Sequence, residues 1–400
     1  MSERPILLLS AEYPPARGGV GDYTACLAAA LAQAGREVDV LTSAGEDDAP
    51  GSAPGVTVHR EVTDWGWGAA REVERVLRRV RPSVACIQYQ TGAYRLRGAI
   101  NLLPRRLLLP GRAWVTTFHD LREPYLFPKA GRLRRLANEE LMRSSRAIVV
   151  TNPEDEAALP AWARDRAVGI PIGANIAPAA PPGFDRAELR ASYGVPPRRT
   201  LVAYFGFLNV SKGLDTLLDA LALLRSRGGD YGLLVVGGGM SASDTTDQAT
   251  AAAFQSQVAA RQLEEVIYRV GYVAPNAVSA ALLSADMAAL PFRDGASLRR
   301  GSLLAVMAHG LPTVTTYPTP QPLSPQAIST WPALRDGENV RLVPPEDAAA
   351  LADALARLAG DSDIRERLRA GALTLAAQFD WDEIAARYLA LFEQLERERT

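Results

Sequence analysis

Short, wholly apolar runs followed by loops and helices recur along the chain. Ile6–Leu9 is the first run, and after a loop and a helix at Tyr23–Gln33 the second run follows at Val38–Leu41. An uninterrupted apolar run of this length is typical of a strand buried on both faces, as in a parallel sheet covered by helices. The pattern restarts with Leu201–Phe205, after a proline-rich break at residues 177–184. The sequence therefore predicts an α/β protein with two parallel-sheet domains.

The length, charge and cysteine content narrow the class of protein further. A chain of 400 residues exceeds one ordinary hydrophobic core, which also favours two domains. The formal net charge of −1 gives no general attraction to nucleic acid. Cys26 and Cys86 are too few for a disulfide framework, and no apolar run approaches the roughly 18 residues of a membrane span. Because no signal-peptide pattern opens the chain, a cytoplasmic protein is expected.

An unusual pair of arginines lies in residues 286–316. This stretch reads as a buried strand, a loop of small residues, and a helix whose start contains Arg299, Arg300 and Gly301. Cations are unfavourable at a helix N-terminus, which already carries a partial positive charge. The combination of free backbone N–H groups and two guanidinium groups favours an anion site, most simply for phosphate. A solvated arginine pair that tolerates the helix dipole is the alternative.

The lysines of the chain point to a second position of the same kind. Lys129 and Lys212 are the only lysines, although the chain has 44 basic residues. Lys212 directly precedes a predicted helix at Leu214–Arg225, where a cation again opposes the helix dipole. A phosphate bound at this helix start would explain why a lysine stands there.

Two features of the first half lie where open α/β sheets bind ligands, at the carboxyl ends of strands. Gly18 and Gly19 belong to a glycine loop after the first strand, and Asp22 is expected to cap the following helix. The glycine spacing is not that of a dinucleotide fingerprint, so a plain loop is the alternative. His119 and Asp120 directly follow another predicted strand. A buried structural histidine remains the alternative to a ligand contact.

A basic and partly apolar surface is predicted between residues 95 and 146. This segment has twelve Arg and Lys residues against four Asp and Glu, with apolar pieces such as Ile100–Leu103 between them. Such a surface could rest on anionic lipid or hold an acidic acceptor. A solvated arginine-rich face is the alternative.

Several motifs along the chain resemble one family. They are PPARGGVGD at residues 14–22, TTFHD at 116–120, SKGLDTLLDALALL from 211, DGENVRLVPP at 336–345, and FDW at 379–381. These motifs, in this order, resemble those of the retaining glycosyltransferases of family 4, also called group 1, which have the GT-B fold. The resemblance covers nearly the whole chain.

The resemblance implies a fold and an activity. It implies two Rossmann-like domains facing a central cleft: an acceptor domain at residues 1–180, completed by a C-terminal helix at 381–400 that crosses back, and a donor domain at 185–380. The implied reaction moves a sugar from a nucleoside diphosphate sugar, of the UDP or GDP type, to an acceptor hydroxyl with retention of configuration. It needs no metal and no cofactor other than the sugar nucleotide.

The resemblance also assigns residues to roles. His119 matches a histidine that contacts the donor sugar, and Gly18 and Gly19 match the loop near the diphosphate and the transferred sugar. Lys212 matches the lysine that binds the diphosphate, and Asn339 matches a position near a turn that faces the donor. Asp120 is the only acid close to a matched motif of the first domain, so no strong nucleophile is evident and a same-face substitution is favoured.

The chain departs from the family pattern at the donor site. Ser297 and Ala305 occupy the two positions of the family's E-x7-E motif, so both carboxylates are absent, and Phe207 replaces an arginine that binds the diphosphate. Ser297 and Gly301 are still expected at the diphosphate. The replacement cation could come from one of three nearby arginines: Arg293, Arg299 or Arg300.

Two rival interpretations follow from these departures. A catalytically silent protein of the same fold, which binds a nucleotide or a glycan as a partner subunit, would explain the missing carboxylates. Lys212 and His119 argue against it because a silent protein has no need to keep them. A sugar epimerase or a phosphorylase of the same fold is disfavoured by the family motifs.

Overall fold

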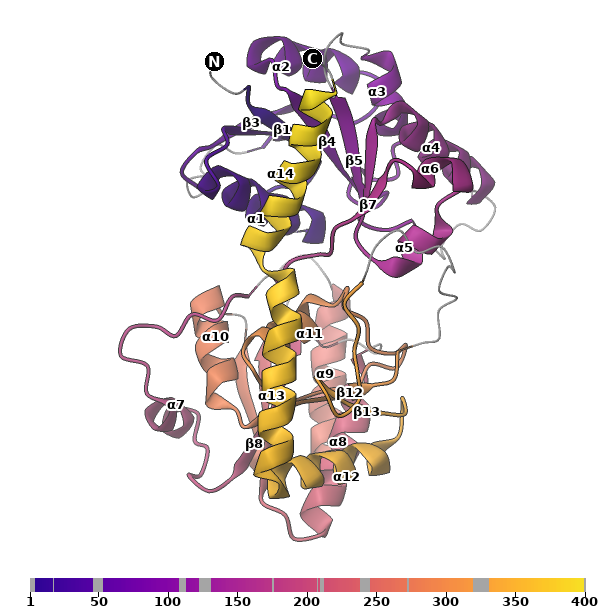
Figure 1. Ribbon diagram of the computed structural model, residues 1–400. Helices are drawn as coiled ribbons and strands as arrows, with labels where there is room; N and C mark the ends of the chain where they lie inside the picture. Colours follow the sequence, from indigo (N-terminus) through magenta and orange to yellow (C-terminus); the bar gives the residue numbers. More distant parts are fainter. Residues whose placement is uncertain are drawn as a thin grey trace. The chain divides into compact units, whose positions relative to one another are not determined.

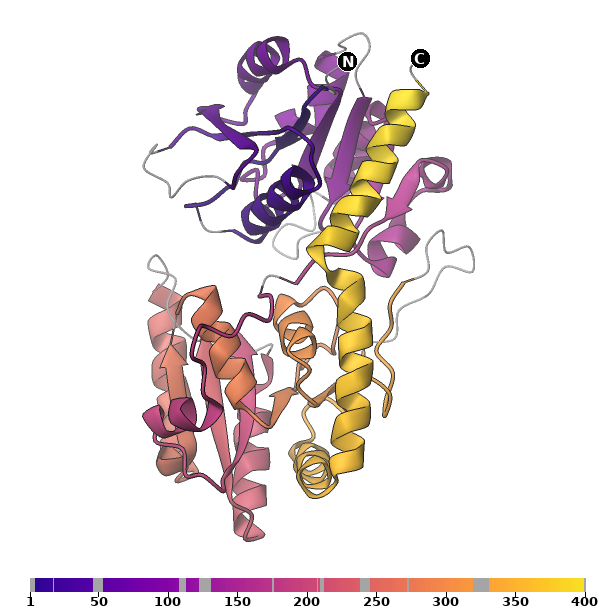
Figure 2. The same ribbon diagram turned by 60° about the vertical axis from the view of Figure 1, so that its left-hand side comes forward.

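The chain forms two compact units (Figures 1 and 2). The computed structural model describes residues 4–16, 18–45, 53–107, 113–121, 131–174, 176–206, 208, 212–237, 245–271, 273–318 and 331–398. Unit 1 consists of Met1–Gly173, Gln321–Trp331 and Asp380–Thr400, and unit 2 consists of Ala174–Pro320 and Pro332–Phe379.

Unit 1 is built on a parallel sheet. Within the described residues it has seven strands in the order β3-β2-β1-β4-β5-β6-β7. The strands are β1 (Ile6–Leu9), β2 (Val38–Ser43), β3 (Val56–Val62), β4 (Val84–Tyr89), β5 (Ala113–Phe118), β6 (Ala147–Val150) and β7 (Ala167–Gly169). The predicted apolar runs are its central strands, and every residue of β1, β4, β5 and β6 is buried.

Helices cover the sheet of unit 1. They are α1 (Gly19–Gln33), α2 (Ala69–Val80), η1 (Gly98–Leu102), α3 (Leu103–Arg106), α4 (Gly131–Ser144), α5 (Pro153–Ala158), α6 (Ala161–Arg164) and the last helix, α14 (Trp381–Arg397). Figure 1 shows α14 in yellow beside α1, and the buried hydroxyls of Tyr23 on α1 and Tyr388 on α14 are 3.1 Å apart. The helix α14 at the end of the chain therefore packs into the same hydrophobic core as β1 and α1 at its beginning.

Unit 2 repeats this plan. Within the described residues its parallel sheet has six strands in the order β10-β9-β8-β11-β12-β13. The strands are β8 (Thr200–Gly206), β9 (Tyr231–Gly237), β10 (Ile267–Gly271), β11 (Met287–Leu290), β12 (Thr313–Thr316) and β13 (Arg341–Val343). The helices are α7 (Arg186–Ser192), α8 (Leu214–Ser226), α9 (Thr245–Ala260), η4 (Glu264–Val266), α10 (Pro275–Ser284), α11 (Gly301–Ala308), α12 (Ala348–Gly360), α13 (Ser362–Ala376) and η5 (Ala377–Phe379). The fold class predicted from the sequence is confirmed.

Two local predictions are wrong. Asp22 does not cap α1, because the helix begins four residues earlier with Gly18 as its N-cap and Asp22 lies in the first turn. The polar composition of residues 240–252 predicts a loop, yet residues from Thr245 onward belong to α9. Phe254 and Val258 of α9 are buried in the core of unit 2, so tertiary packing holds a helix whose start is polar.

Candidate functional site

The strand order of unit 2 reverses between β8 and β11, which lie side by side although they are far apart in the sequence. In open parallel sheets, ligands bind outside the carboxyl ends of the strands at such a reversal. Lys212 comes after β8, and the loop 291–300 comes after β11. Both cationic helix starts singled out in the sequence therefore lie at the reversal of this unit.

Gly213 brings the Lys212 segment against the end of β11. Its φ of 65° is in the left-handed region, and it is the N-cap of α8. A Cβ at this position would lie 1.9 Å from the carbonyl oxygen of Pro291, so a larger residue cannot be accommodated without a backbone shift. The chain can therefore pass directly over Pro291 only with glycine at this position.

The side chains of Lys212 and Arg300 share the ring of Phe292. The Nζ atom of Lys212 lies 5.0 Å, and the Cζ atom of Arg300 4.1 Å, from the ring centroid of this fully buried phenylalanine. Burial and the Arg300 guanidinium lower the pKa of Lys212 to about 8, and the Asp294 carboxylate opposes this shift. Holding two cations so close costs free energy that a bound anion would recover.

The start of α11 has further hydrogen-bond donors. Arg300 is its N-cap and forms an ion pair with the exposed Asp294, with an Nη2–Oδ1 distance of 2.5 Å. Among the described residues, the buried Nε of Arg300 and the buried Oγ of Ser302 have no hydrogen-bond partner. Gly301 is the first residue of this helix, so its N–H has no partner within the helix. Acceptor oxygens of a phosphate would satisfy such donors.

The other candidates on this loop have different surroundings. The guanidinium of Arg293 pairs with Asp215 and with Glu346, so this arginine is already neutralised by carboxylates. The Oγ of Ser297 accepts a hydrogen bond from the backbone N–H of Arg299 at 3.3 Å, and both residues are half-buried. Phe207 lies outside the described residues. The structure thus brings Arg300 to Lys212 and keeps Arg293 in an ion-pair cluster of its own.

Asn339 does not lie at this edge of the sheet. It precedes β13, and because the strands are parallel this position belongs to the amino edge, opposite the edge that holds Lys212. Its side-chain oxygen accepts from the backbone N–H of Arg335 at 2.8 Å, and its amide nitrogen donates to the carbonyl of Ala333 at 3.1 Å. Both polar groups of the Asn339 side chain therefore bond within their own turn, and its donor-facing role stays a prediction.

The glycine loop of unit 1 packs against a carboxylate. A Cβ on Gly18 would lie 1.9 Å from Oε2 of Glu12, whereas nothing lies within 4 Å of a Cβ on Gly19. Burial, and then the Asp22 carboxylate, raises the pKa of Glu12, and burial raises the pKa of Asp22. These two carboxyl groups at the start of α1 repel a phosphate. This helix start is better suited to the hydroxyl groups of a sugar.

His119 lies at the same edge of unit 1, directly after β5. Its ring meets the ring of Tyr23, from the first turns of α1, edge-on at 4.6 Å between centroids. The Nε2 atom of His119 is 3.0 Å from Oε1 of Gln88, so Nε2 carries the proton and Nδ1 remains an acceptor. Burial lowers the pKa of His119 to about 3, so the ring is neutral near pH 7. Asp120 follows it, half-buried.

A buried polar chain connects His119 with the last helix. The Nε2 atom of Gln88 donates to Cys86 Sγ at 3.3 Å, and that sulfur is 3.6 Å from the hydroxyl of Thr117. The Thr117 hydroxyl lies 2.9 Å from that of Tyr388 on α14. In the sequence, these contacts are indicated only by the polar side chains of Gln88 and Thr117 within the apolar strands β4 and β5, where a polar residue needs a partner.

Comparison with known proteins identifies the family. Residues 18–173 match the family model of the glycosyl transferase 4-like domain, and residues 199–361 match that of the glycosyl transferases group 1. A D-inositol 3-phosphate glycosyltransferase of Jonesia denitrificans is 28% identical, over 94% of this chain and 91% of that protein. A phosphatidyl-myo-inositol mannosyltransferase of Mycobacterium leprae is 32% identical, over 57% of this chain and 53% of that protein.

Solved structures share the fold of the whole chain. HepE from Anabaena, in complex with UDP and glucose, superposes with a TM-score of 0.70 at 19% identity, over 97% of this chain and 99% of that one. Sucrose-phosphate synthase from Thermosynechococcus elongatus superposes with a TM-score of 0.72 at 21% identity, over 99% of this chain and 100% of that one. The chain belongs to the group 1 glycosyltransferases of family 4 and has their GT-B fold.

Proposed function

We propose that this glycosyltransferase takes its sugar from a nucleoside diphosphate sugar, of the UDP or GDP type, and transfers it with retention of configuration and without a metal ion. The observation that carries the proposal is the meeting of Lys212 and Arg300 on the ring of Phe292, at the strand reversal of unit 2. The complex of HepE with UDP and glucose, on the same fold, supports a donor of this class.

In the proposed reaction, the bond between the anomeric carbon and the diphosphate oxygen breaks and the bond to the acceptor oxygen forms on the same face of the sugar. The acceptor hydroxyl gives its proton to the departing diphosphate. Negative charge grows on that diphosphate, so cations and helix N–H groups placed around it lower the barrier. Lys212, Arg300 and the N–H of Gly301 supply this charge, with Arg299 and Ser297 beside them.

Unit 1 supplies contacts to the sugar in this proposal. The unprotonated Nδ1 of His119 accepts a hydrogen bond from a sugar hydroxyl, and Gly19 leaves room at the start of α1. Asp120 is adjacent and is the remaining candidate for a catalytic contact. A neutral histidine suits this role because it binds a hydroxyl without attracting the diphosphate.

The proposed acceptor is an anionic polyol or a lipid head group that carries one. The curated relatives are named for inositol phosphate and phosphatidylinositol. The described parts of residues 95–146 also carry exposed apolar side chains among arginines: Leu96 at 52%, Leu133 at 72% and Leu136 at 56% exposure. We propose that this surface makes a peripheral contact with an anionic membrane. No helix among the described residues is long and apolar enough to cross a bilayer.

The donor proposal is tested by incubating the protein with a panel of UDP-, GDP- and ADP-sugars and measuring released nucleotide. Arg300→Gln should lower kcat/KM by about 100-fold, because one preorganised charge at the leaving group is removed. Arg335→Gln, an exposed arginine of the same unit at the other edge of the sheet, is the control. Turnover by Arg300→Gln at the wild-type rate would contradict the proposal, and no turnover or stabilisation with any donor would favour a silent binding protein.

The membrane proposal has its own test, sedimentation with vesicles containing a fifth of anionic lipid. Leu136→Asp puts a charge into the exposed apolar part of α4 and should reduce the bound fraction several-fold, since a buried charge at the interface is costly. Leu373→Asp, an exposed leucine at 41% in unit 2, is the matched control. Equal binding by both variants would remove the proposed surface.

A further inference from the structure

Unit 2 contains a cavity of about 870 Å³ at the amino edge of its sheet. The walls come from α7 and the segment up to β8, from the turns before β11 and β12, and from the ends of α12 and α13. This is the edge opposite Lys212 and Arg300, so the cavity is separate from the proposed donor site. Its volume is within the range of sites that hold small molecules, about 300–1,000 Å³.

Arginines dominate the lining of this cavity. Six line it, against one carboxylate, that of Asp286. The lining arginines are Arg186, Arg190, Arg198, Arg199, Arg365 and Arg369. The Arg199 side chain pairs with Asp230 at 2.7 Å, so its charge is neutralised and does not count toward the charge of the cavity. Burial lowers the pKa of His309, another lining residue, so it adds no charge near neutral pH.

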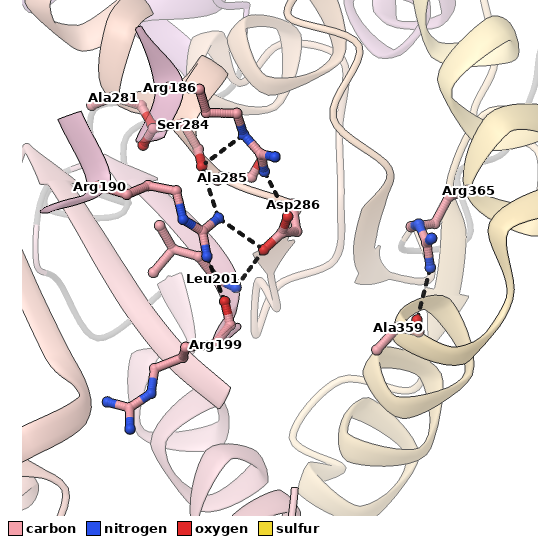
Figure 3. A network of polar contacts seen from close by, with 10 residues as sticks. All are labelled: Arg186, Arg190, Arg199, Leu201, Ala281, Ser284, Ala285, Asp286, Ala359 and Arg365. Atoms are coloured by element: carbon pink, nitrogen blue, oxygen red, sulfur yellow. Dashed lines mark hydrogen bonds and ion pairs between the residues drawn. The ribbon is translucent and has the colours of Figure 1, made fainter. Parts of the chain in front are cut away.

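Three of these arginines have a structural role. Figure 3 shows Arg186 and Arg190 converging on Asp286, with ion-pair distances of 2.5 and 3.1 Å, and on backbone carbonyls at the end of α10. On the opposite side of the same view, Arg365 donates to the carbonyl of Ala359 at the end of α12. It also donates to the carbonyl of Leu358. These contacts fix α7 and neutralise helix C-termini, which carry about half a negative charge each.

The structural role does not account for the remaining charge. Arg198 and Arg369 are exposed, and within the described part of the chain neither forms a hydrogen bond or an ion pair. The Arg369 stem lies against the turn after α11, where a Cβ on Gly310 would be 3.3 Å from its Cγ. Asp286 contributes one negative charge, and the C-termini of α10, α11 and α12 contribute about half a charge each, so an excess of between two and three positive charges remains on the five other arginines.

We infer that this cavity is a second anion site, which binds a small phosphomonoester. A phosphomonoester carries close to two negative charges at neutral pH, which matches the excess, and its oxygens suit the paired donors of guanidinium groups. Arg198, Arg365 and Arg369 bind the phosphate. The organic part lies against apolar side chains of the same cavity: Leu283, Met287 and Leu311.

A ligand in this cavity would contact both the first segment of unit 2, before β8, and one of its last helices, α13. Arg198 lies between α7 and β8, soon after the chain enters the unit at Ala174, while Arg365 and Arg369 belong to α13, which leads to its exit at Phe379. The site is therefore suited to an effector that tightens unit 2 without touching the donor.

The experiment measures binding of glycerol 2-phosphate by calorimetry on the full chain, at constant ionic strength. Each Arg→Gln change should weaken binding about tenfold, so the double variant Arg198→Gln/Arg369→Gln should bind about 100-fold more weakly than wild type. Both side chains are exposed and unpaired in the described structure, so the variant should fold. Arg357→Gln, an exposed arginine of α12 that does not line the cavity, should bind like wild type.

Lys212→Met separates this site from the donor site. The variant should keep full affinity for glycerol 2-phosphate even though it loses the proposed diphosphate contact. Loss of binding in Lys212→Met, unchanged binding in the double variant, or no binding by wild type at millimolar concentration would each overturn the inference. None of these results depends on whether the protein turns over a sugar nucleotide.

Discussion

Replacing Lys212 by methionine should make unit 2 more stable while removing a ligand contact. The folded protein holds the lysine beside Arg300 and lowers its pKa from 10.5 to about 8. One pKa unit corresponds to about 1.4 kcal/mol, so keeping the ammonium protonated at pH 7 costs about 3 kcal/mol. Methionine has a similar length and no charge, so Lys212→Met should raise the free energy of unfolding by up to this amount.

The pH dependence identifies the cause of this gain. Between about pH 8 and 10.5 the unfolded chain binds the lysine proton and the folded chain does not, so wild-type stability rises with pH across this window. The advantage of Lys212→Met should therefore fall from about 3 kcal/mol at pH 7 to about 1.5 kcal/mol at pH 9.5. Lys212→Arg is the control, because its guanidinium stays charged and should give no gain at pH 7.

The assay must separate the two units. All six tryptophans of the chain fall in unit 1, so tryptophan fluorescence during urea unfolding follows that unit alone. Circular dichroism follows the unfolding of both units. The gain in the free energy of unfolding should appear in the transition of unit 2, which tryptophan fluorescence does not detect. A Lys212→Met protein that is less stable than wild type at pH 7, or a gain that is the same at both pH values, would refute the charge-repulsion argument.

Three other predictions follow from the structure. Gly213→Ala should lower the free energy of unfolding of unit 2 by at least about 2 kcal/mol, measured by urea unfolding. The control is Gly228→Ala, at a φ of 82° with open space around it, which should lower the same free energy by about 1 kcal/mol. Equal losses in the two variants would contradict the steric argument. Gln88→Leu removes the acceptor of His119 Nε2, so the nitrogen NMR signals of this ring should change from one tautomer to a mixture, and an unchanged tautomer would remove Gln88 as its positioning residue. Affinity for the nucleoside diphosphate that binds best should fall by up to tenfold per pH unit above about pH 8, and this decline should be absent in Lys212→Arg, which titration calorimetry can check.

The sequence predicted the central strands well and the helix ends less well. Ile6–Leu9 has the predicted bounds, because a short and wholly apolar run between polar segments has few other solutions. The sequence places Gly18 and Gly19 in a loop and begins the helix at Tyr23, whereas α1 begins at Gly19, because a first helical turn needs no hydrogen-bond partners for its N–H groups. The helix α9 was missed because its burial depends on distant residues.

Parts of the candidate site could be predicted, but not their pairing. The helix starts at Lys212 and Arg300 follow from the local pattern of residues. That both side chains meet on Phe292 depends on the strand order, which brings together segments 80 residues apart. The contact of Gln88 with His119 likewise depends on the pairing of β4 with β5.

The packing of α14 against α1 sets the order in which the protein can be completed during synthesis. Ile384, Tyr388 and Phe392 of α14 are fully buried in the same core as Ile6 and Leu8 of the first strand. All of unit 2 lies between these segments in the sequence. The ribosome therefore synthesises all of unit 2 before the last core residues of unit 1, and a fragment ending at residue 173 would leave uncovered the apolar side chains that share a core with α14.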